Sequence, residues 1–233
     1  MAGSDTLVVR VATFNAQHGA RRGRLPSTRG LVETCRGLDA DVLGLQEVDR
    51  HVPRTWFADQ PARVARVLGH RHRSAAAKRT WIGGRQCNAL CARGWIGDVE
   101  VVALPVLPQD ERRVLLLARV VLPGGALTVG VTHLATGGRA RAQLPVVLER
   151  LEARPPPHLL LGDLNLTEGD VEPALAAHGL RAAPSGPTFP ALSPHRRIDW
   201  IAVGGGLSVG PARVHRPLVG DHCPIVADIA FGS

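Results

Sequence analysis

Six apolar segments of this sequence end in acids, amides or imidazoles, where strands ordinarily stop in turn residues such as glycine, proline or serine. The polar ends are T-F-N at 13–15, L-Q-E at 45–47, T-H-L at 132–134, G-D-L-N at 162–165, R-I-D-W at 197–200 and G-D-H at 220–222. Carboxylate and amide oxygens bind hard cations, and carboxylates and imidazoles move protons. Because layered folds bind ligands at the carboxyl ends of strands, these side chains could converge on one crevice.

Each residue also has an ordinary structural interpretation. Asn15 alone is more typical of a cap or turn, and Glu47 alone of a solvated loop acid. Asp163 and Asn165 could form only an Asx turn, and Asp199 lies in an apolar segment where a buried acid needs a partner. Six such ends in one chain are hard to attribute to turns, and they favour metal and phosphate chemistry.

The elements that must position these residues are mostly short strands. We expect strands at 7–15, 41–48, 88–93, 99–104, 113–122, 127–134, 159–164, 198–203, 207–215 and 225–231, and helices at 27–38, 59–68, 139–153 and 169–178. The segments 18–30 and 69–86 lack periodicity and are expected to be mobile loops. Mixed strands with interspersed helices imply two packed sheets covered by helices.

Length and composition fit one globular domain over residues 1–233. Of the 233 residues, 45% are hydrophobic and 21% charged, so a sizeable core is available and disorder is disfavoured. No apolar run reaches the roughly 20 residues of a transmembrane helix. The N-terminus has no basic region followed by a separate apolar region, so we expect no signal peptide and a cytoplasmic location. The oligomeric state is left open.

The four cysteines are Cys35, Cys87, Cys91 and Cys223. Cys87 and Cys91 have C-x3-C spacing, but no second Cys or His pair stands nearby at the spacing of a zinc finger. Reduced thiols in a cytosolic protein are therefore the favoured interpretation, and structural zinc the weaker one.

The formal net charge of +8 suggests an anionic partner. The excess is concentrated between Arg54 and Arg93, where nine basic residues face a single acid, Asp59. A compositional bias competes with this interpretation, because Lys78 is the only lysine among 28 basic residues, as a GC-rich genome would favour. Anion steering and compositional drift both remain open for residues 54–93.

The segments around the polar strand ends resemble, in order, the signature blocks of the endonuclease/exonuclease/phosphatase superfamily. This superfamily includes DNase I-like nucleases, abasic-site endonucleases, inositol-phosphate phosphatases and sphingomyelinases, and the chain is most similar to its compact bacterial members. The matching segments are VATFNAQHG, DVLGLQEVD, CNALCAR, VTHLATGGRARAQL, LLGDLNLTE, TFPALSPHRRIDWIAV and GDHCPIVADI. They span residues 7 to 231. The resemblance implies a DNase I-like four-layer α/β sandwich, with two mixed β-sheets face to face and flanked by helices.

The resemblance also implies a divalent-metal site. It assigns Glu47, with Asn15 and Asp221, to Mg²⁺, with Mn²⁺ as the other possibility. Oxygen ligands suit Mg²⁺, which keeps several waters and takes few protein contacts. Such a metal would neutralise charge on the phosphoryl and leaving oxygens.

Five residues receive catalytic roles from the same resemblance. His222 resembles the histidine that contacts the scissile phosphate, with Asp199 bonded to its other ring nitrogen. Asp163 resembles the residue that orients or deprotonates the attacking water, and Asn165 would donate to that water or to the phosphate. His133 would hold a phosphoryl oxygen.

The block CNALCAR suggests two substrate-binding residues, Asn88 and Arg93. Asn88 fits the family block that lines the cleft, whereas the arginine of the usual Leu-Ser-Arg ending is displaced by one position to Arg93. Gly220 stands where a serine is usual. The chain has no tyrosine, which counts against a standard abasic-site endonuclease.

The sequence therefore predicts a Mg²⁺-dependent phosphoesterase that hydrolyses a phosphodiester or phosphomonoester. A nuclease needs a basic groove, for which residues 54–93 are a candidate, although aromatic residues for base stacking are scarce. A small-molecule or lipid phosphodiesterase needs a closed pocket or an apolar lip, which Trp56, Phe57, Trp81 and Ile82 could supply. The alternative is a catalytically silent module that binds a phosphorylated or protein partner. The complete set of acids, amides and histidines argues against it.

Overall fold

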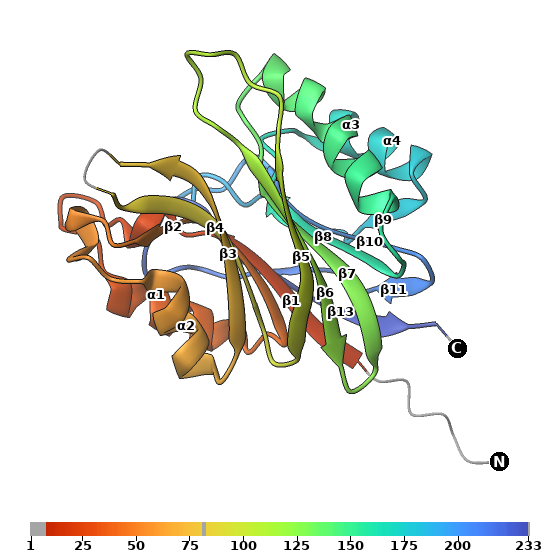
Figure 1. Ribbon diagram of the computed structural model, residues 1–233, viewed down its shortest axis with the longest axis horizontal. Helices are drawn as coiled ribbons and strands as arrows, with labels where there is room; N and C mark the ends of the chain where they lie inside the picture. Colours follow the sequence, from red (N-terminus) through yellow and green to blue (C-terminus); the bar gives the residue numbers. More distant parts are fainter. Residues whose placement is uncertain (1–7, 81–82, 233) are drawn as a thin grey trace.

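Two mixed β-sheets pack face to face between two pairs of helices in the computed structural model, which describes residues 8–80 and 83–232 (Figure 1). The helices α1 and α2 cover the outer face of one sheet, and α3 and α4 cover the outer face of the other. The expected four-layer α/β sandwich is therefore confirmed.

The first sheet has the strand order β11-β13-β1-β2-β4-β3, with β12 paired to β13. Within it, β1 and β2 are parallel and are joined through α1, while the other pairs are antiparallel. Its elements are β1 Val8–Asn15, α1 Thr28–Leu38, β2 Val42–Arg50, α2 Gln60–Leu68, β3 Arg71–Arg79, β4 Arg85–Ala92, β11 Leu207–Val209, β12 Arg213–Val214 and β13 Ile225–Phe231, with short 3-10 helices η1 Gln17–Gly19 and η2 Pro53–Thr55.

The second sheet has the order β5-β6-β7-β8-β10-β9. Here β7 and β8 are the parallel pair, joined through α3, so both sheets contain one crossover unit of strand, helix and strand. Its elements are β5 Trp95–Ala103, β6 Val114–Leu122, β7 Gly125–His133, α3 Gly138–Glu152, β8 His158–Asp163, α4 Glu168–Ala177, β9 Leu180–Ala182 and β10 Asp199–Gly204.

Apolar residues form three layers of core, one between the sheets and one under each helix pair. The two sheets are in close contact where β2 crosses β8. A Cβ added at Gly44 would lie only 2.9 Å from Cβ of Leu161. Glycine at this position therefore lets β2 lie directly against β8.

The expectation of a mobile loop over 69–86 is wrong for most of its length, because β3 occupies Arg71–Arg79. The segment R-H-R-S-A-A-A-K-R has no alternating pattern and few residues that favour strands. It is the edge strand of the first sheet and pairs only with β4. Exposed cationic side chains are typical of edge strands, because they discourage pairing with other chains.

Smaller departures concern strand limits. The strand expected at 99–104 begins at Trp95, the one expected at 207–215 is divided into β11 and β12, and β9 was not anticipated. All four expected helices are present to within a few residues. Trp81 and Ile82, proposed for an apolar lip, lie outside the described residues.

All four cysteines are free and buried. Cys87 and Cys91 lie on β4 and pack into the core beneath α1 and α2. Burial raises the pKa of Cys87 to about 11 and that of Cys91 to about 12, so both thiols stay protonated at neutral pH. Reduced thiols fit this setting better than zinc ligands do. Within the described part of the chain, no helix has the length and apolarity to cross a membrane.

Candidate active site

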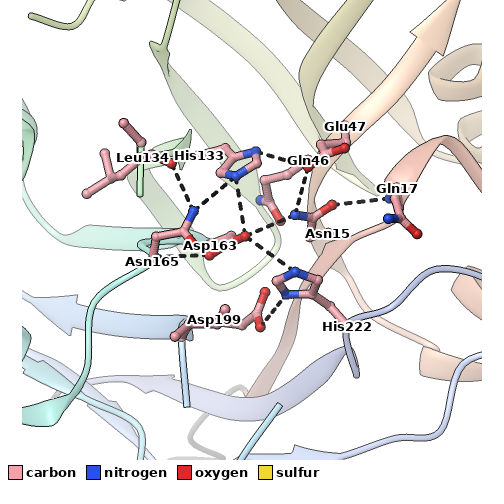
Figure 2. A network of polar contacts seen from close by, with 12 residues as sticks. Asn15, Gln17, Gln46, Glu47, His133, Leu134, Asp163, Asn165, Asp199 and His222 are labelled. Atoms are coloured by element: carbon pink, nitrogen blue, oxygen red, sulfur yellow. Dashed lines mark hydrogen bonds and ion pairs between the residues drawn. The ribbon is translucent and has the colours of Figure 1, made fainter. Parts of the chain in front are cut away.

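The polar strand ends converge at one edge of the sandwich, between the two sheets (Figure 2). The parallel register pairs His133, the last residue of β7, with Asp163, the last residue of β8. Because β10 runs antiparallel to β8, its first residue, Asp199, lies opposite Asp163. Asn15 ends β1 and reaches across to the second sheet. Strand direction therefore brings His133, Asp163 and Asp199 to the same edge of the second sheet.

Asp163 is at the centre of the cluster and its side chain is 1% exposed. Its Oδ2 accepts a hydrogen bond from Asn15 Nδ2 at 2.9 Å, and its Oδ1 accepts one from the backbone N–H of Asn165 at 3.0 Å. The Nε2 atoms of His133 and His222 lie 3.4 and 3.7 Å from Oδ2. Burial raises the pKa of Asp163 above its ordinary value, although both histidines oppose this shift.

His222 is held by a buried carboxylate. Its Nδ1 donates to Asp199 Oδ2 at 2.9 Å, and the same oxygen accepts from the Thr188 hydroxyl at 2.5 Å. The ring of Phe189 packs against the imidazole with centroids 4.8 Å apart. Thr188 and Phe189 therefore fix the orientation of the pair. Neither was anticipated, since both lie in a connecting segment and not at a strand end.

At neutral pH His222 is positively charged and His133 is neutral. Burial by itself would lower the pKa of His222, but the charge and hydrogen bond of Asp199, together with Asp163 and Asp221, raise it to about 9. Burial lowers the pKa of His133 to about 4, which Asp163 counteracts only in part. Asp163 is thus flanked by an imidazolium on one side and a neutral imidazole on the other.

Asn165 determines how His133 is oriented. Its Nδ2 lies 3.2 Å from His133 Nε2 and also donates to the carbonyl oxygen of Leu134 at 3.0 Å. An accepting Nε2 places the proton of the neutral ring on Nδ1, which lies 3.7 Å from Glu47 Oε1. The left-handed backbone of Asn165, with φ of 52°, turns its side chain back towards the histidine.

Glu47 is aimed into the site by a β-bulge. The register of β2 against β4 shifts between Leu45 and Val48, and Glu47 has a φ of 54°. A bulge re-aims a side chain that a regular strand would turn elsewhere, and a positive φ in a non-glycine residue is strained. Its carboxylate accepts from Asn15 Nδ2 at 3.3 Å and from Gln86 Nε2 at 3.2 Å. Burial raises the pKa of Glu47, and Asp163 and Asp221 add to the shift.

Asp221 lies at the mouth of the site, with its side chain 42% exposed. Its Oδ2 accepts from Gln17 Nε2 at 3.1 Å, while the backbone N–H of Gln17 donates to Asn15 Oδ1 at the same distance. Gly220 precedes it with φ +82°, and a Cβ there would lie 3.2 Å from the carbonyl oxygen of Ala16. This backbone accounts for glycine where the resemblance leads one to expect serine.

Two groupings of these residues could hold a cation. Asp163, Asp199 and His222 offer ligand atoms within 4.8 Å of one another. However, His222 Nδ1 already donates to Asp199, and a metal there would have to break that bond. Glu47 and Asp221 offer carboxylate oxygens on partly exposed side chains. The amide of Asn15 lies beside Glu47 but would have to turn to offer its oxygen, because its Nδ2 faces Glu47 and its Oδ1 accepts from the Gln17 N–H. Burial is the main reason for the raised pKa of Glu47, and the negative charges of Asp163 and Asp221 raise it further; a divalent cation would neutralise these charges, so this second group suits a hard cation better.

Of the two substrate-binding candidates, Asn88 lies beside the site and Arg93 does not. Asn88 is buried, donates to the Val114 carbonyl oxygen at 3.0 Å, and lines a small hollow with Glu47 and His133. Because β4 runs antiparallel to β2, the C-terminal end of β4 lies beside the start of β2. Arg93 follows β4 and is therefore at the opposite end of the strands from the site, 2.8 Å from Asp39 and 3.3 Å from Asp41. The substrate-binding expectation for Arg93 is corrected on this ground.

Arg113 lines the same small hollow but was not anticipated. Its side chain is 15% exposed, and its positive charge lowers the pKa values of Glu47 and His133. The buried Nε has no hydrogen-bond partner among the described residues. Arg113 directly precedes β6, which runs antiparallel to β7, so it meets the end of β7. Arg113 was missed because the sequence was inspected for acids, amides and imidazoles and not for arginines at the starts of strands.

The basic stretch 54–93 is distributed over several elements. Arg54 binds Asp49 through two hydrogen bonds of 2.8 Å, Lys78 pairs with Glu111, and Arg93 pairs with Asp39. The other basic residues lie on α2, on β3 and at the start of β4. The basic residues of 54–93 are therefore spread over α2, β3, β4 and the loops beside them, and three of them are paired with acids.

Comparison with known proteins agrees with this geometry. The model of the Endonuclease/Exonuclease/phosphatase family matches residues 12–222. No curated protein matches the sequence. An endonuclease/exonuclease/phosphatase from Beutenbergia cavernae DSM 12333 has 27% identity and a TM-score of 0.80, covering 97% of this chain and 72% of that chain.

Two further solved structures share the fold. A mannosyl-6-phosphatase from Bacteroides thetaiotaomicron has a TM-score of 0.77 at 17% identity, covering 96% of this chain and 100% of that chain. The human Nocturnin catalytic domain with bound sulfate has a TM-score of 0.73 at 20% identity, covering 96% and 93%.

Proposed function

Since the chain belongs to the endonuclease/exonuclease/phosphatase family, whose members are phosphoesterases, we propose that it hydrolyses a phosphate ester with the help of Mg²⁺ or Mn²⁺. One observation carries the proposal. A buried carboxylate, Asp163, lies between a charged histidine and a neutral one, with both Nε2 atoms directed at its Oδ2 (Figure 2).

In the proposed reaction, Asp163 removes a proton from the attacking water. Its raised pKa makes it a stronger base than an ordinary aspartate, and efficient bases have pKa values near the working pH. The hydrogen bonds from Asn15 and the Asn165 backbone fix both carboxylate oxygens, so the base is already oriented before substrate binds.

His222 then stabilises the negative charge that develops on a phosphoryl oxygen. Its Nδ1–H is engaged by Asp199, which leaves Nε2–H to donate to the phosphate. Asp199 is a positioning residue, because it holds the ring in place and keeps it charged. His133, as a neutral imidazole held by Asn165, supplies a second donor through Nδ1 on the Glu47 side.

Glu47, Asn15 and Asp221 are the residues proposed to hold the metal. Their oxygen atoms suit a hard cation, and the accumulation of negative charge around Glu47 supports this placement. When bound, the metal would neutralise charge on the phosphoryl and leaving oxygens.

The relatives support a phosphate group as the target, since one is named a mannosyl-6-phosphatase and another binds sulfate. A phosphodiester and a phosphomonoester both suit the proposed chemistry. A screen with and without Mg²⁺ over single-stranded DNA, duplex DNA, RNA, inositol phosphates, sugar phosphates and sphingomyelin tests both.

Asp163→Asn should abolish hydrolysis of whichever ester is turned over, while its melting temperature stays the same or rises. The second expectation follows because a buried carboxylate with a raised pKa destabilises the fold at neutral pH, and the amide removes that charge. Asp228→Asn, on the surface of β13, is the matched control and should keep full activity. Full turnover by Asp163→Asn, or no metal-dependent turnover of any ester, would reject the proposal in favour of a silent binding module.

A further inference from the structure

A large open hollow borders the catalytic cluster on the side of Asp221. Its volume is about 880 Å³, within the range of sites for organic ligands. Three segments of chain line it, at 17–24, 190–193 and 216–221. Apart from Asp221, the residues that line it have no role in the reaction proposed above.

Four arginines surround the hollow: Arg21, Arg22, Arg24 and Arg216. None of them forms a salt bridge with another described residue, whereas arginines elsewhere, such as Arg54 and Arg141, bind carboxylates. Among the described residues that line the hollow, Asp221 is the single acidic one. Four uncompensated guanidiniums beside one hollow favour an anionic ligand, because guanidinium binds phosphate in a bidentate manner.

The walls of the hollow are fixed by backbone hydrogen bonds. The N–H of Gly220 donates to the carbonyl of Ala20 at 2.8 Å, which joins the first wall to the third. The N–H of Ala191 donates to the carbonyl of Asp221 at 2.7 Å, which joins the second wall to the third. Arg21 is held as well, because its Nε donates to the Leu25 carbonyl at 3.1 Å. These hydrogen bonds join the backbones of the three segments to one another.

The hollow and the catalytic cluster share a border at Gln17 and Asp221. The backbone of Gln17 contacts Asn15 in the cluster, and its side chain contacts Asp221 in the hollow. A substrate whose scissile phosphate lies beside His222 would therefore extend past Asp221 towards the arginines. Exposed apolar side chains, Leu192 and Leu218, line the same hollow and can contact the organic part of such a substrate.

We propose that this hollow is a subsite for a second phosphate of the substrate. This subsite rests on the phosphoesterase function proposed above. The chemical class is an ester with at least two phosphates in sequence, of which a single-stranded oligonucleotide is the tested example. The apolar lining accommodates the group between phosphates, and the arginines bind the neighbouring phosphate itself.

Binding is measured without metal and without turnover, by fluorescence anisotropy of a labelled oligothymidylate in EDTA. The double variant Arg22→Ala/Arg216→Ala should lose roughly tenfold or more in affinity at low salt. It should also flatten the slope of log affinity against log salt by about 0.7, the value for loss of one phosphate contact in a single strand. The matched control is Arg36→Ala/Arg66→Ala, which removes the same charge from exposed positions in the groove between α1 and α2.

Competition by dinucleotides separates a second phosphate from general charge attraction. We expect pTpT or TpTp to compete more strongly than TpT against the unaltered protein, and this advantage to disappear in Arg22→Ala/Arg216→Ala. Equal losses in both double variants, or no advantage for either extra phosphate, would overturn the subsite. Loss of binding to phosphatidylglycerol vesicles alone, with the oligonucleotide unaffected, would overturn it in favour of a lipid surface. A failure of hydrolysis in the substrate screen leaves these binding results readable, so the two proposals fail separately.

Discussion

Replacement of Asp199 by asparagine tests how the fold keeps His222 charged. The change preserves the shape of the side chain and a hydrogen-bond acceptor for the ring, but it removes the negative charge 2.9 Å from Nδ1. Burial of His222 remains and favours the neutral ring. The pKa of His222 should therefore fall towards its ordinary value.

The size of the effect follows from the pKa of about 9, against an ordinary value of 6.5. This difference corresponds to about 3 kcal/mol in favour of the imidazolium, since a tenfold change in an equilibrium constant is worth about 1.4 kcal/mol. At neutral pH the unaltered His222 is almost fully charged, whereas a ring with a pKa near 6.5 is mostly neutral. If the charged ring stabilises the transition state, kcat should fall by about 100-fold, as for loss of one donor to a developing oxyanion.

The pKa is read from the imidazole resonances in an NMR titration of the protein in EDTA. Unfolding measurements against pH give a second test. Because the folded pKa is raised, the contribution of His222 to stability is complete below pH 6.5 and is lost as pH rises through about 9. The stability difference between Asp199→Asn and the unaltered protein should therefore be largest in acid and smallest above about pH 9.

Two results would refute the reasoning. One is a His222 resonance in the unaltered protein that titrates near 6.5, and the other is an unchanged high pKa in Asp199→Asn. Asp228→Asn serves as the control, because Asp228 pairs with Arg10 on the surface and should leave His222 unaffected.

Three further predictions concern the metal, the substrate and the core. Glu47→Gln should weaken Mn²⁺ binding in isothermal titration by at least about tenfold, while Glu33→Gln on the surface of α1 should not; equal affinities would remove Glu47 from the metal site. Arg113→Ala should raise KM about tenfold with a smaller change in kcat, because it removes a charge beside the phosphate; an unchanged KM would leave Arg113 a structural residue. Gly44→Ala should destabilise the fold by about 1–3 kcal/mol in urea denaturation, because the added methyl group meets Leu161. Gly37→Ala, with open space around it in α1, should stabilise the fold by up to about 1 kcal/mol. A change of unfolding free energy with the same sign in both variants would contradict the close sheet contact.

Much of the fold is readable from local patterns. The four helices follow from apolar spacing and breakers, and most core strands follow from short apolar runs. The edge strand β3 could not be found this way. Its residues carry little strand preference of their own, and it exists because β4 offers an unpaired edge to it. Strand formation there is decided by the partner and not by the segment.

The active-site cluster was likewise only partly foreseeable. Residues that end strands were recognised because acids and imidazoles are unusual there, and the structure brings Asn15, Asp163, His133 and His222 together. The substrate-binding prediction for Arg93 was wrong because a short block of sequence does not reveal the direction of its strand within the sheet. The antiparallel direction of β4 places Asn88 beside the site and Arg93 at the opposite end of the strands.

What the sequence by itself determined is the inventory of chemical groups and their order along the chain: carboxylates, amides and imidazoles at strand ends, in blocks that resemble one family. What only the tertiary structure decided is the charge and direction of each group. His133 and His222 have the same side chain, yet burial makes one neutral and the carboxylate of Asp199 makes the other charged. Electrostatic energies depend on distance and burial, and both are set by residues far apart in the sequence.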